Sequence, residues 1–112
     1  MRKIIAGVGI VTMAGVWGMQ NAVAVEDDGS IRDFKAVESA MQAHDKQVYT
    51  GNADVDFRRR LIVKRQGIID MAEVAMAHAK DPQTEALARK VIANQRRDIA
   101  EMQQWLKSTH VE

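Results

Sequence analysis

The stretch from residue 55 to residue 82 reads VDFRRRLIVKRQGIIDMAEVAMAHAKDP, and its pattern decides the fold class. Apolar residues recur in it at helical spacing, at Phe57, Leu61, Ile68, Ala72, Ala75 and Ala79. This spacing puts them on one face of an amphipathic helix, which we predict over residues 55–79. The helix should end before Asp81-Pro82, because the residue that precedes a proline avoids the α conformation.

Another helix is predicted on the N-terminal side, over residues 30–48, with Ser30 as its cap. Its apolar residues follow the same spacing, at Ile31, Phe34, Val37, Met41 and Val48. The hexapeptide YTGNAD at residues 49–54 then breaks the pattern, and Asp54 can accept hydrogen bonds from the free N–H groups of the next helix. We therefore expect a turn between the first two helices.

A third helix is predicted from Pro82 to about Lys107, with Asp81 as its cap, because proline suits the first helical position. Its apolar face includes Leu87, Val91, Ile99, Met102 and Leu106. No segment shows the alternating pattern of a strand. Three helices with short connections predict an all-α fold, a small up-down antiparallel three-helix bundle.

The first 24 residues differ in composition from the rest of the chain. Arg2 and Lys3 precede an uncharged run over residues 4–19, and the small residues Ala22 and Ala24 follow. This order is typical of a secretory signal peptide, with cleavage expected after Ala24. A retained membrane anchor is the alternative, but sixteen residues are fewer than the roughly 20 that a spanning helix needs.

Removal of residues 1–24 would leave one helical domain, residues 25–112, in the periplasm or secreted. The net charge would change from +1 to −1, because the removed segment carries two basic residues and no acid. We therefore expect no nucleic-acid binding, and no membrane contact after cleavage. The chain has no Cys, which excludes disulfides and thiolate metal sites, and so small a core is compatible with a monomer or a homodimer.

Polar side chains on the apolar helix faces are candidate functional residues, because an unpaired buried polar group costs roughly 1–3 kcal/mol. They are His44, Lys64, Arg65 and Gln95. In one interpretation Lys64 and Arg65 lie along the apolar surface, and their charged ends reach solvent or a carboxylate. In the other, His44, Gln95 and one basic side chain form a polar layer inside the bundle.

Methionines are a second kind of candidate, at Met41, Met71, Met76 and Met102. A thioether is a soft ligand that suits Cu(I), usually beside histidine, although methionine at helical spacing is more often part of a core. No histidine pair, carboxylate pair with a base, or nucleophile near a histidine is present, so we predict no enzyme activity. The basic run at residues 58–60 indicates a solvated face or an acidic partner.

Four motifs follow one another in the chain: YTGNADVDF at 49–57, QGIIDMA at 66–72, Asp81-Pro82, and Trp105-Leu106. Together they resemble the family known as domain of unknown function 305, over about residues 36–107. The resemblance implies an exported helical protein with a ferritin-like fold. The family includes copper-binding proteins of the CopM type.

The chain departs from the family pattern at one place. Relatives usually carry MIPHH directly before the position of Gln66, and the resemblance implies that the paired histidines bind metal. Here residues 61–65 read LIVKR, so Lys64 and Arg65 replace both histidines. Two protonated side chains cannot coordinate a metal ion and would repel it.

Two functions therefore stay open. The resemblance implies copper binding or copper homeostasis, and the side chains left for Cu(I) are Met41, His44, Met71 and Met102. Copper binding of this kind would be weak or lost. The alternative is a non-catalytic helical interaction module that has lost the metal site of the family and has a protein as its partner.

Overall fold

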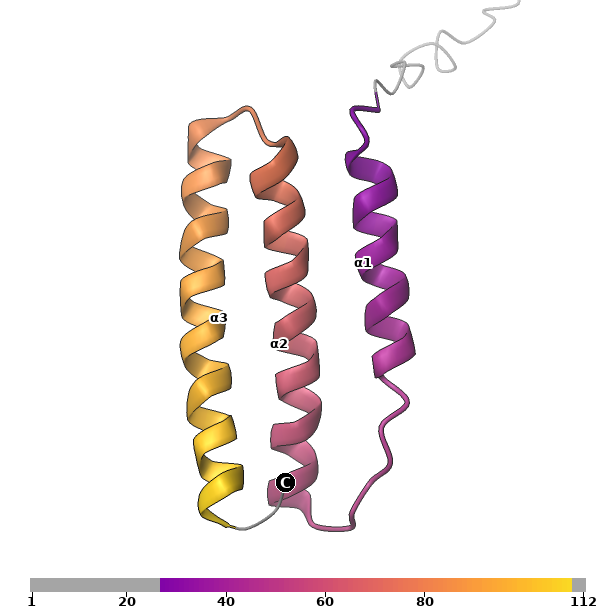
Figure 1. Cartoon of the computed structure of the whole chain (residues 1–112), viewed down its shortest axis with the longest axis vertical. Helices are drawn as coiled ribbons and strands as arrows, with labels where there is room; N and C mark the ends of the chain where they lie inside the picture. The colour runs from indigo at the N-terminus through magenta and orange to yellow at the C-terminus, as the bar shows by residue number, and fades with distance from the viewer. Residues whose placement is uncertain (1–26, 110–112) are drawn as a thin grey trace, which may run out of the picture.

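A computed structural model describes residues 27–109 of the chain as three helices (Figure 1). They are α1 (Ser30–His44), α2 (Ala53–His78) and α3 (Pro82–Ser108). Each runs antiparallel to the next, which confirms the predicted all-α up-down arrangement. The predicted signal peptide, residues 1–24, and His110 lie outside the described residues.

The first helix ends earlier than the sequence pattern predicts. α1 stops at His44 instead of residue 48, and Val48 is 89% exposed, so no apolar contact holds this residue in a helix. The predicted cap is also wrong, because Ser30 is already helical. The cap position belongs to Gly29, whose φ of 91° lies in the left-handed region that glycine adopts without strain.

Side-chain caps fix the starts of the other two helices. Asn52 caps α2, in place of the predicted Asp54, and its Oδ1 accepts hydrogen bonds from the backbone N–H groups of residues 54 and 55 at 3.0 and 3.4 Å. Asp81 caps α3 as predicted, and Pro82 occupies the first turn. Because each cap satisfies N–H groups that have no helical partner, both boundaries are well defined.

The connection between α1 and α2 is anchored by a carboxylate in the first turn of α2. Asp56 accepts hydrogen bonds from the backbone N–H and hydroxyl of Thr50, at 2.8 and 2.7 Å, and from the N–H of Gly51 at 3.0 Å. These hydrogen bonds, those of Thr50 first, lower the pKa of Asp56. Gly51 has a φ of 86°, so the turn requires a residue that tolerates the left-handed region.

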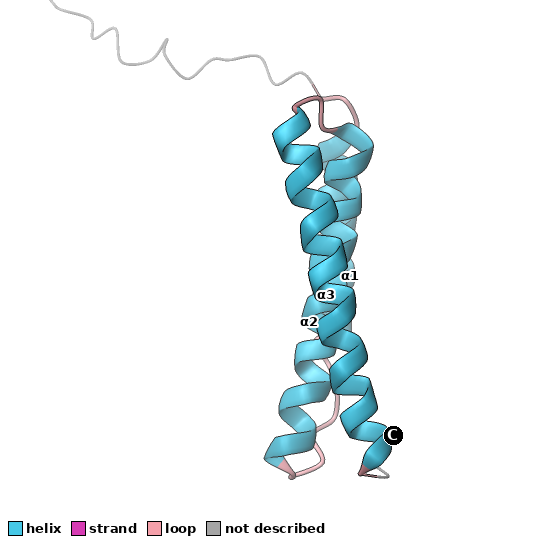
Figure 2. Ribbon diagram, turned by 90° about the vertical axis from the view of Figure 1, so that its left-hand side faces the viewer, coloured by secondary structure: helices cyan, strands magenta, loops and turns pink. Residues whose placement is uncertain are grey.

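The three helices lie side by side in one layer with α2 in the middle (Figures 1 and 2). α1 and α3 each pack against α2, and within the described residues no Cα atom of α1 comes within 8 Å of one in α3. In residues 27–109 the buried apolar side chains all come from α2 and α3: Val55, Ile69, Ala72, Ala88, Ile99 and Leu106. α1 has no buried residue and is therefore the less firmly held helix.

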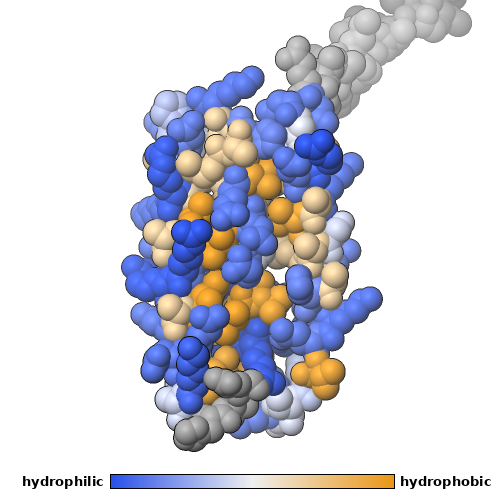
Figure 3. Space-filling model, in the orientation of Figure 1, coloured by the Kyte–Doolittle hydropathy of each residue, from blue (hydrophilic) through white to orange (hydrophobic). Residues whose placement is uncertain are grey.

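One broad face of the layer shows apolar side chains gathered along the central helix, with hydrophilic side chains along the outer edges (Figure 3). This is the distribution expected when two outer helices bury their inner faces against a shared neighbour. None of the helices in residues 27–109 combines the length and the apolar composition that a membrane crossing requires.

α1 approaches α2 closely at Gly67, which is buried. A Cβ atom at this position would lie 2.5, 2.6 and 2.7 Å from the Cγ, Sδ and Cε atoms of Met41. Real side-chain carbons do not come this close, so Met41 can lie flat on α2 because residue 67 has no side chain. The pair Met41–Gly67 therefore sets the distance between α1 and α2.

A valine at position 67 should force Met41 away and destabilise the fold by about 1–3 kcal/mol, as overpacked cores do. We expect Gly67→Val and Met41→Ala to cost less together than the sum of their separate costs, measured by urea unfolding. Ala86→Val, at an exposed position of α3, measures what valine costs relative to alanine without a packing conflict. Since glycine is a poorer helix former than valine, helix propensity cannot produce the loss expected for Gly67→Val. Additive costs would show that the two side chains do not compete for one space.

Candidate functional site

Two of the four predicted copper ligands, Met41 and His44, line the same pocket. The pocket has a volume of about 250 Å³ and lies over α2, with α1 and α3 as its walls. Apolar side chains, among them Ile62 and Ile99, form part of the lining. Its polar lining groups, apart from His44, are the side chains of Gln66, Asp70 and Gln103. Met41 and His44 are three residues apart on α1, which is the spacing of neighbours on one helix face.

Met71 lies on the other side of α2. It lines a separate apolar pocket of about 240 Å³, together with Phe34, Ile68 and Leu87. Gln66 lines the Met41 pocket, and Ile68 lines the pocket beside Met71. These two residues are two positions apart on α2, which is about 200° around the helix, so the two pockets open on opposite faces of the layer. Met71 is 43% exposed.

Met102 on α3 does not lie opposite Met71 on α2. Two contacts between these antiparallel helices fix which residues face each other: Arg58 stacks on Trp105, and Arg65 pairs with Asp98. In this register Met102 lies opposite about Leu61. Met71 is ten residues further along α2, about 15 Å at the helical rise of 1.5 Å per residue. The described structure thus brings Met41 and His44 together and holds Met71 and Met102 apart from each other.

Acidic and histidine side chains offer no alternative metal centre in the part of the chain that the structure describes. Residues 27–109 contain no group of three or more His, Asp or Glu side chains arranged to hold one ion. Any soft-metal site in this region therefore depends on methionine.

Arg65 forms a polar bridge between α2 and α3. Its Nη1 donates hydrogen bonds to Oε1 of Gln95 at 2.7 Å and to Oδ2 of Asp98 at 2.9 Å. The Arg65 side chain is only 25% exposed, and its Nε is buried without a hydrogen-bond partner among the described residues. The polar layer that the second interpretation puts inside the bundle is therefore not formed as predicted, because His44 takes no part in this contact and no polar side chain among residues 27–109 is buried. Arg65 and Gln95 do meet, together with Asp98, in the partly exposed contact between α2 and α3.

The sequence pattern contains a signal for Asp98. It follows Gln95 by three residues, so both side chains lie on the same face of α3 and can reach one guanidinium group. Lys64 has a different neighbour, because its Nζ lies 3.7 Å from Oδ1 of Asp45 beyond the end of α1. Both charged ends therefore reach a carboxylate, as the first of the two sequence interpretations predicts.

The basic run at residues 58–60 contributes contacts within the fold. The guanidinium carbon of Arg58 lies 3.7 Å from the centre of the Trp105 ring, a cation–π contact between α2 and α3. Arg60 pairs with Asp45 at 2.9 Å and lies 4.8 Å from the ring centre of Tyr49. Two of the three arginines thus fasten the α1–α2 connection and α3 to the central helix.

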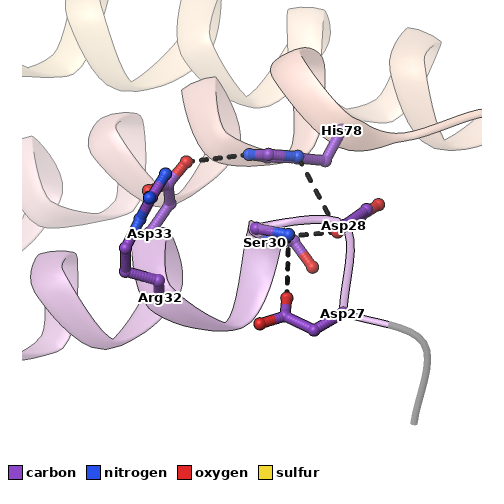
Figure 4. Close-up of polar contacts among 7 residues, drawn as sticks. Asp27, Asp28, Ser30, Arg32, Asp33 and His78 are labelled. Atoms are coloured by element: carbon purple, nitrogen blue, oxygen red, sulfur yellow. Dashed lines mark hydrogen bonds and ion pairs between the residues drawn. The ribbon is translucent and has the colours of Figure 1, made fainter.

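His78 joins the C-terminal end of α2 to the N-terminal end of α1 (Figure 4). Its Nε2 lies 2.8 Å from Oδ2 of Asp33, and its Nδ1 lies 3.8 Å from Oδ1 of Asp28. The hydrogen bond with His78, followed by that with Arg32, lowers the pKa of Asp33 below its ordinary value of 3.8. Hydrogen bonds from Ser30 lower the pKa of Asp28, with a smaller contribution from the charge of His78.

The pairing of His78 with Asp33 was not predicted from the sequence. The two residues are far apart in the chain and meet only because α1 and α2 are antiparallel in one particular register. The contact gives α1 a polar attachment at the end opposite to Asp45, which compensates in part for its lack of buried residues.

Asp33 should make the attachment of α1 sensitive to acid. Because the pKa of Asp33 is lower in the folded chain, its stabilising effect is complete above about pH 3.8 and is lost as the pH falls through the folded value. In His78→Ala the carboxyl of Asp33 should titrate closer to 3.8, measured by NMR from pH 7 to pH 2. Arg32→Ala should cause a smaller shift, and an unchanged titration in His78→Ala would contradict this assignment.

These features define a small all-α protein with a layer of three helices and an arginine bridge between α2 and α3. Residues 54–112 match the sequence model of the domain of unknown function DUF305, which is more than half of the chain. The chain therefore belongs to the DUF305 family, as the motif resemblance predicts. The matched segment includes α3 and all but the first residue of α2, hence Arg65, Gln95 and Asp98. No curated protein matches the chain.

Proposed function

We propose that the chain is an exported, non-catalytic helical binding protein in which Arg65 occupies the place of the metal site implied by the family resemblance. The observation that carries this proposal is the bridge from Arg65 to Gln95 and Asp98, at 2.7 and 2.9 Å. Export rests on the signal-like composition of residues 1–24.

The chemistry of the bridge opposes a metal ion at this position. A guanidinium group stays protonated at every physiological pH and has no lone pair to donate. It carries a permanent positive charge into the α2–α3 interface, where its side chain is 25% exposed. This charge would repel an incoming metal cation. The ammonium group of Lys64, which lies 3.7 Å from Asp45, would add to the repulsion. The cation that links the two helices is therefore part of the protein itself.

The pocket beside Met41 is the surface that we assign to a partner. Part of its lining is apolar, and Gln66, Asp70 and Gln103 add groups that donate and accept hydrogen bonds. An apolar cavity with a few polar groups is the usual composition of a binding site. No general base beside a nucleophile lines this pocket, so binding without catalysis is the simpler function for it.

Weak binding of Cu(I) is a second candidate, favoured by the position of Met41 and His44 in one pocket. A thioether and an imidazole are suitable ligands for this soft ion. Met71 and Met102 do not belong to this second candidate, because Met71 lines the pocket on the opposite face and Met102 is not among the residues that line the Met41 pocket. Two ligands in a partly open pocket predict modest affinity.

Titration with Cu(I) against a chromophoric chelator tests both candidates, with protein purified from cells that produce the full-length chain. We expect no competition at micromolar protein, since the ligand set is incomplete. The double variant Lys64→His/Arg65→His should gain Cu(I) binding, because it restores two imidazoles at the family position. Lys64→Gln/Arg65→Gln is the matched control, which removes both charges without adding a ligand.

Three outcomes decide between the candidates. Competition by the unchanged protein that disappears in Met41→Leu/His44→Asn would establish the copper candidate and contradict our main proposal. A gain of binding in the glutamine control would mean that charge alone had excluded the metal. If the histidine variant keeps its helical circular dichroism but gains no binding, residues 64 and 65 are not at the family's metal position.

A further inference from the structure

We propose that the Met41 pocket binds a small organic cation, an alkylammonium ion whose charged end pairs with Asp70. The inference rests on the proposed function, which assigns this pocket to a partner, and it adds the chemical class of that partner. The supporting observation is a partly buried carboxylate, with no cation beside it among the described residues, at one end of a largely apolar pocket.

Asp70 differs from the other partly buried carboxylates of residues 27–109. Four of these meet a cationic side chain or a backbone N–H group of the protein: Asp33, Asp56, Glu85 and Asp98. Asp70 meets neither in the described part of the chain, and its one hydrogen bond there comes from Nε2 of Gln66 at 3.0 Å. Because a charge that is partly removed from water is stabilised by an opposite charge, Asp70 is a suitable partner for an incoming cation.

The pocket is a groove along α2, and Asp70 lies at one end of it. The α2 residues in its lining follow the spacing of a single helix face: Ile62, Val63, Gln66, Gly67 and Asp70. From residue 62 to residue 70 the helix rises by about 12 Å. Met41 of α1 and Ile99 of α3 add apolar side chains to the walls. A ligand with one charged end and an apolar body matches this distribution.

His44 lies toward the other end of the groove. Met41 lies against Gly67, and α1 is antiparallel to α2, so His44 is displaced by about 4.5 Å toward the start of α2. Asp70 is displaced by about 4.5 Å in the opposite direction. The two residues are thus about 9 Å apart along the helix axis, which leaves the carboxylate available to a ligand.

The volume of the pocket limits the size of the ligand. A water molecule occupies about 30 Å³ in the liquid, so a pocket of about 250 Å³ has room for around eight waters or a similar number of larger atoms. A short alkyl chain would remove water from the apolar lining, while its ammonium group forms a charge-assisted hydrogen bond with Asp70.

An ammonium group suits this position better than a metal ion does. Calcium and magnesium need about six or more oxygen ligands, and residues 27–109 hold no group of three or more His, Asp or Glu side chains arranged for one ion. An ammonium group has three N–H donors and needs fewer protein ligands. Gln66 uses its amide nitrogen for Asp70, so its amide oxygen can accept a second hydrogen bond from the same ligand.

The pocket beside Met71 provides an internal comparison. Its volume of about 240 Å³ is almost the same as that of the Met41 pocket. No charged side chain lines it, and its one side-chain hydroxyl belongs to Thr84. A preference for cationic ligands should therefore be confined to the Met41 pocket, whereas apolar binding alone would be similar in both.

Titration with hexylammonium ions tests the proposal, with protein from cells that produce the full-length chain and carbon-13-labelled methionine methyl groups observed by NMR. We expect the Met41 methyl signal to shift with a Kd on the order of 1 mM, a typical value for so small a ligand. 1-Hexanol, which has the same chain without the charge, should bind there about threefold more weakly or worse. Hexanoate, which carries a negative charge, should leave this signal unchanged. At Met71, hexylammonium should bind no more tightly than 1-hexanol.

Asp70→Asn removes the charge and keeps the size of the side chain. It should lower the affinity for hexylammonium to that for 1-hexanol, a loss of about threefold or more. Its helical circular dichroism should be retained, because Asp70 has no cationic partner to lose among the described residues. Glu101→Gln is the matched control, since Glu101 is exposed on α3 and does not line the pocket. This variant should keep the full preference for the cation.

Each contrary result has its own meaning. If 1-hexanol shifts Met41 as strongly as hexylammonium and Asp70→Asn changes neither, the pocket binds apolar molecules without regard to charge. That result overturns this inference and leaves the proposed function standing. Binding of a lysine-containing peptide without any binding of hexylammonium would overturn it in favour of a protein partner. If none of the three six-carbon probes shifts Met41, the inference is wrong, and the Cu(I) titration then judges the proposed function separately.

Discussion

The arrangement of the molecule depends on one constraint: α1 and α3 pack against α2 and not against each other. A helix that packs against two neighbours needs apolar or small residues on two opposite sides. α2 meets this requirement with Gly67 toward α1, and with Val55 and Ile69 in the core that it shares with α3. The arrangement leaves two broad faces, and each has its own chemistry. One carries the Met41 pocket with its polar groups, and the other carries the exposed apolar side chains.

Polar contacts hold the helices together where few apolar side chains are buried between them. Arg65 bridges α2 and α3 through Gln95 and Asp98, while His78 ties the start of α1 to the end of α2. The Arg65 bridge carries our proposed function, because the family resemblance implies histidine at this position. In that proposal a residue that never loses its proton stands where the resemblance implies residues that can bind metal.

Much of this fold could be predicted from the sequence, and the failures have physical causes. Asp81 and Pro82 marked the start of α3 correctly, because capping and proline geometry act locally. The end of α1 was wrong because apolar spacing alone included Val48, which is 89% exposed and gains nothing from a helix. Asn52 and Asp54 were equally good caps by residue type, and only the backbone geometry decides between them.

The site was harder to predict than the helices, since it depends on the register between them. Spacing along one helix correctly put Met41 and His44 together. Met71 is kept from them by its position on the opposite face of α2, and the residues of α2 that lie level with Met102 are set by contacts between helices, such as Arg58 with Trp105. The bridge from Arg65 to Asp98 is of the same kind: the spacing of Gln95 and Asp98 puts both on one face of α3, but only the register between α2 and α3 brings Arg65 to them.

Native-state hydrogen exchange of the backbone amides tests the central claim, which is that α2 is the shared support of two separate helix interfaces. We predict that amides of α2 and α3 exchange together, with the highest free energies of opening, while those of α1 exchange through a separate opening of lower free energy. If α1 amides exchange with the same free energy as those of α2 and α3, the three helices open as one unit and α2 does not support two separate interfaces.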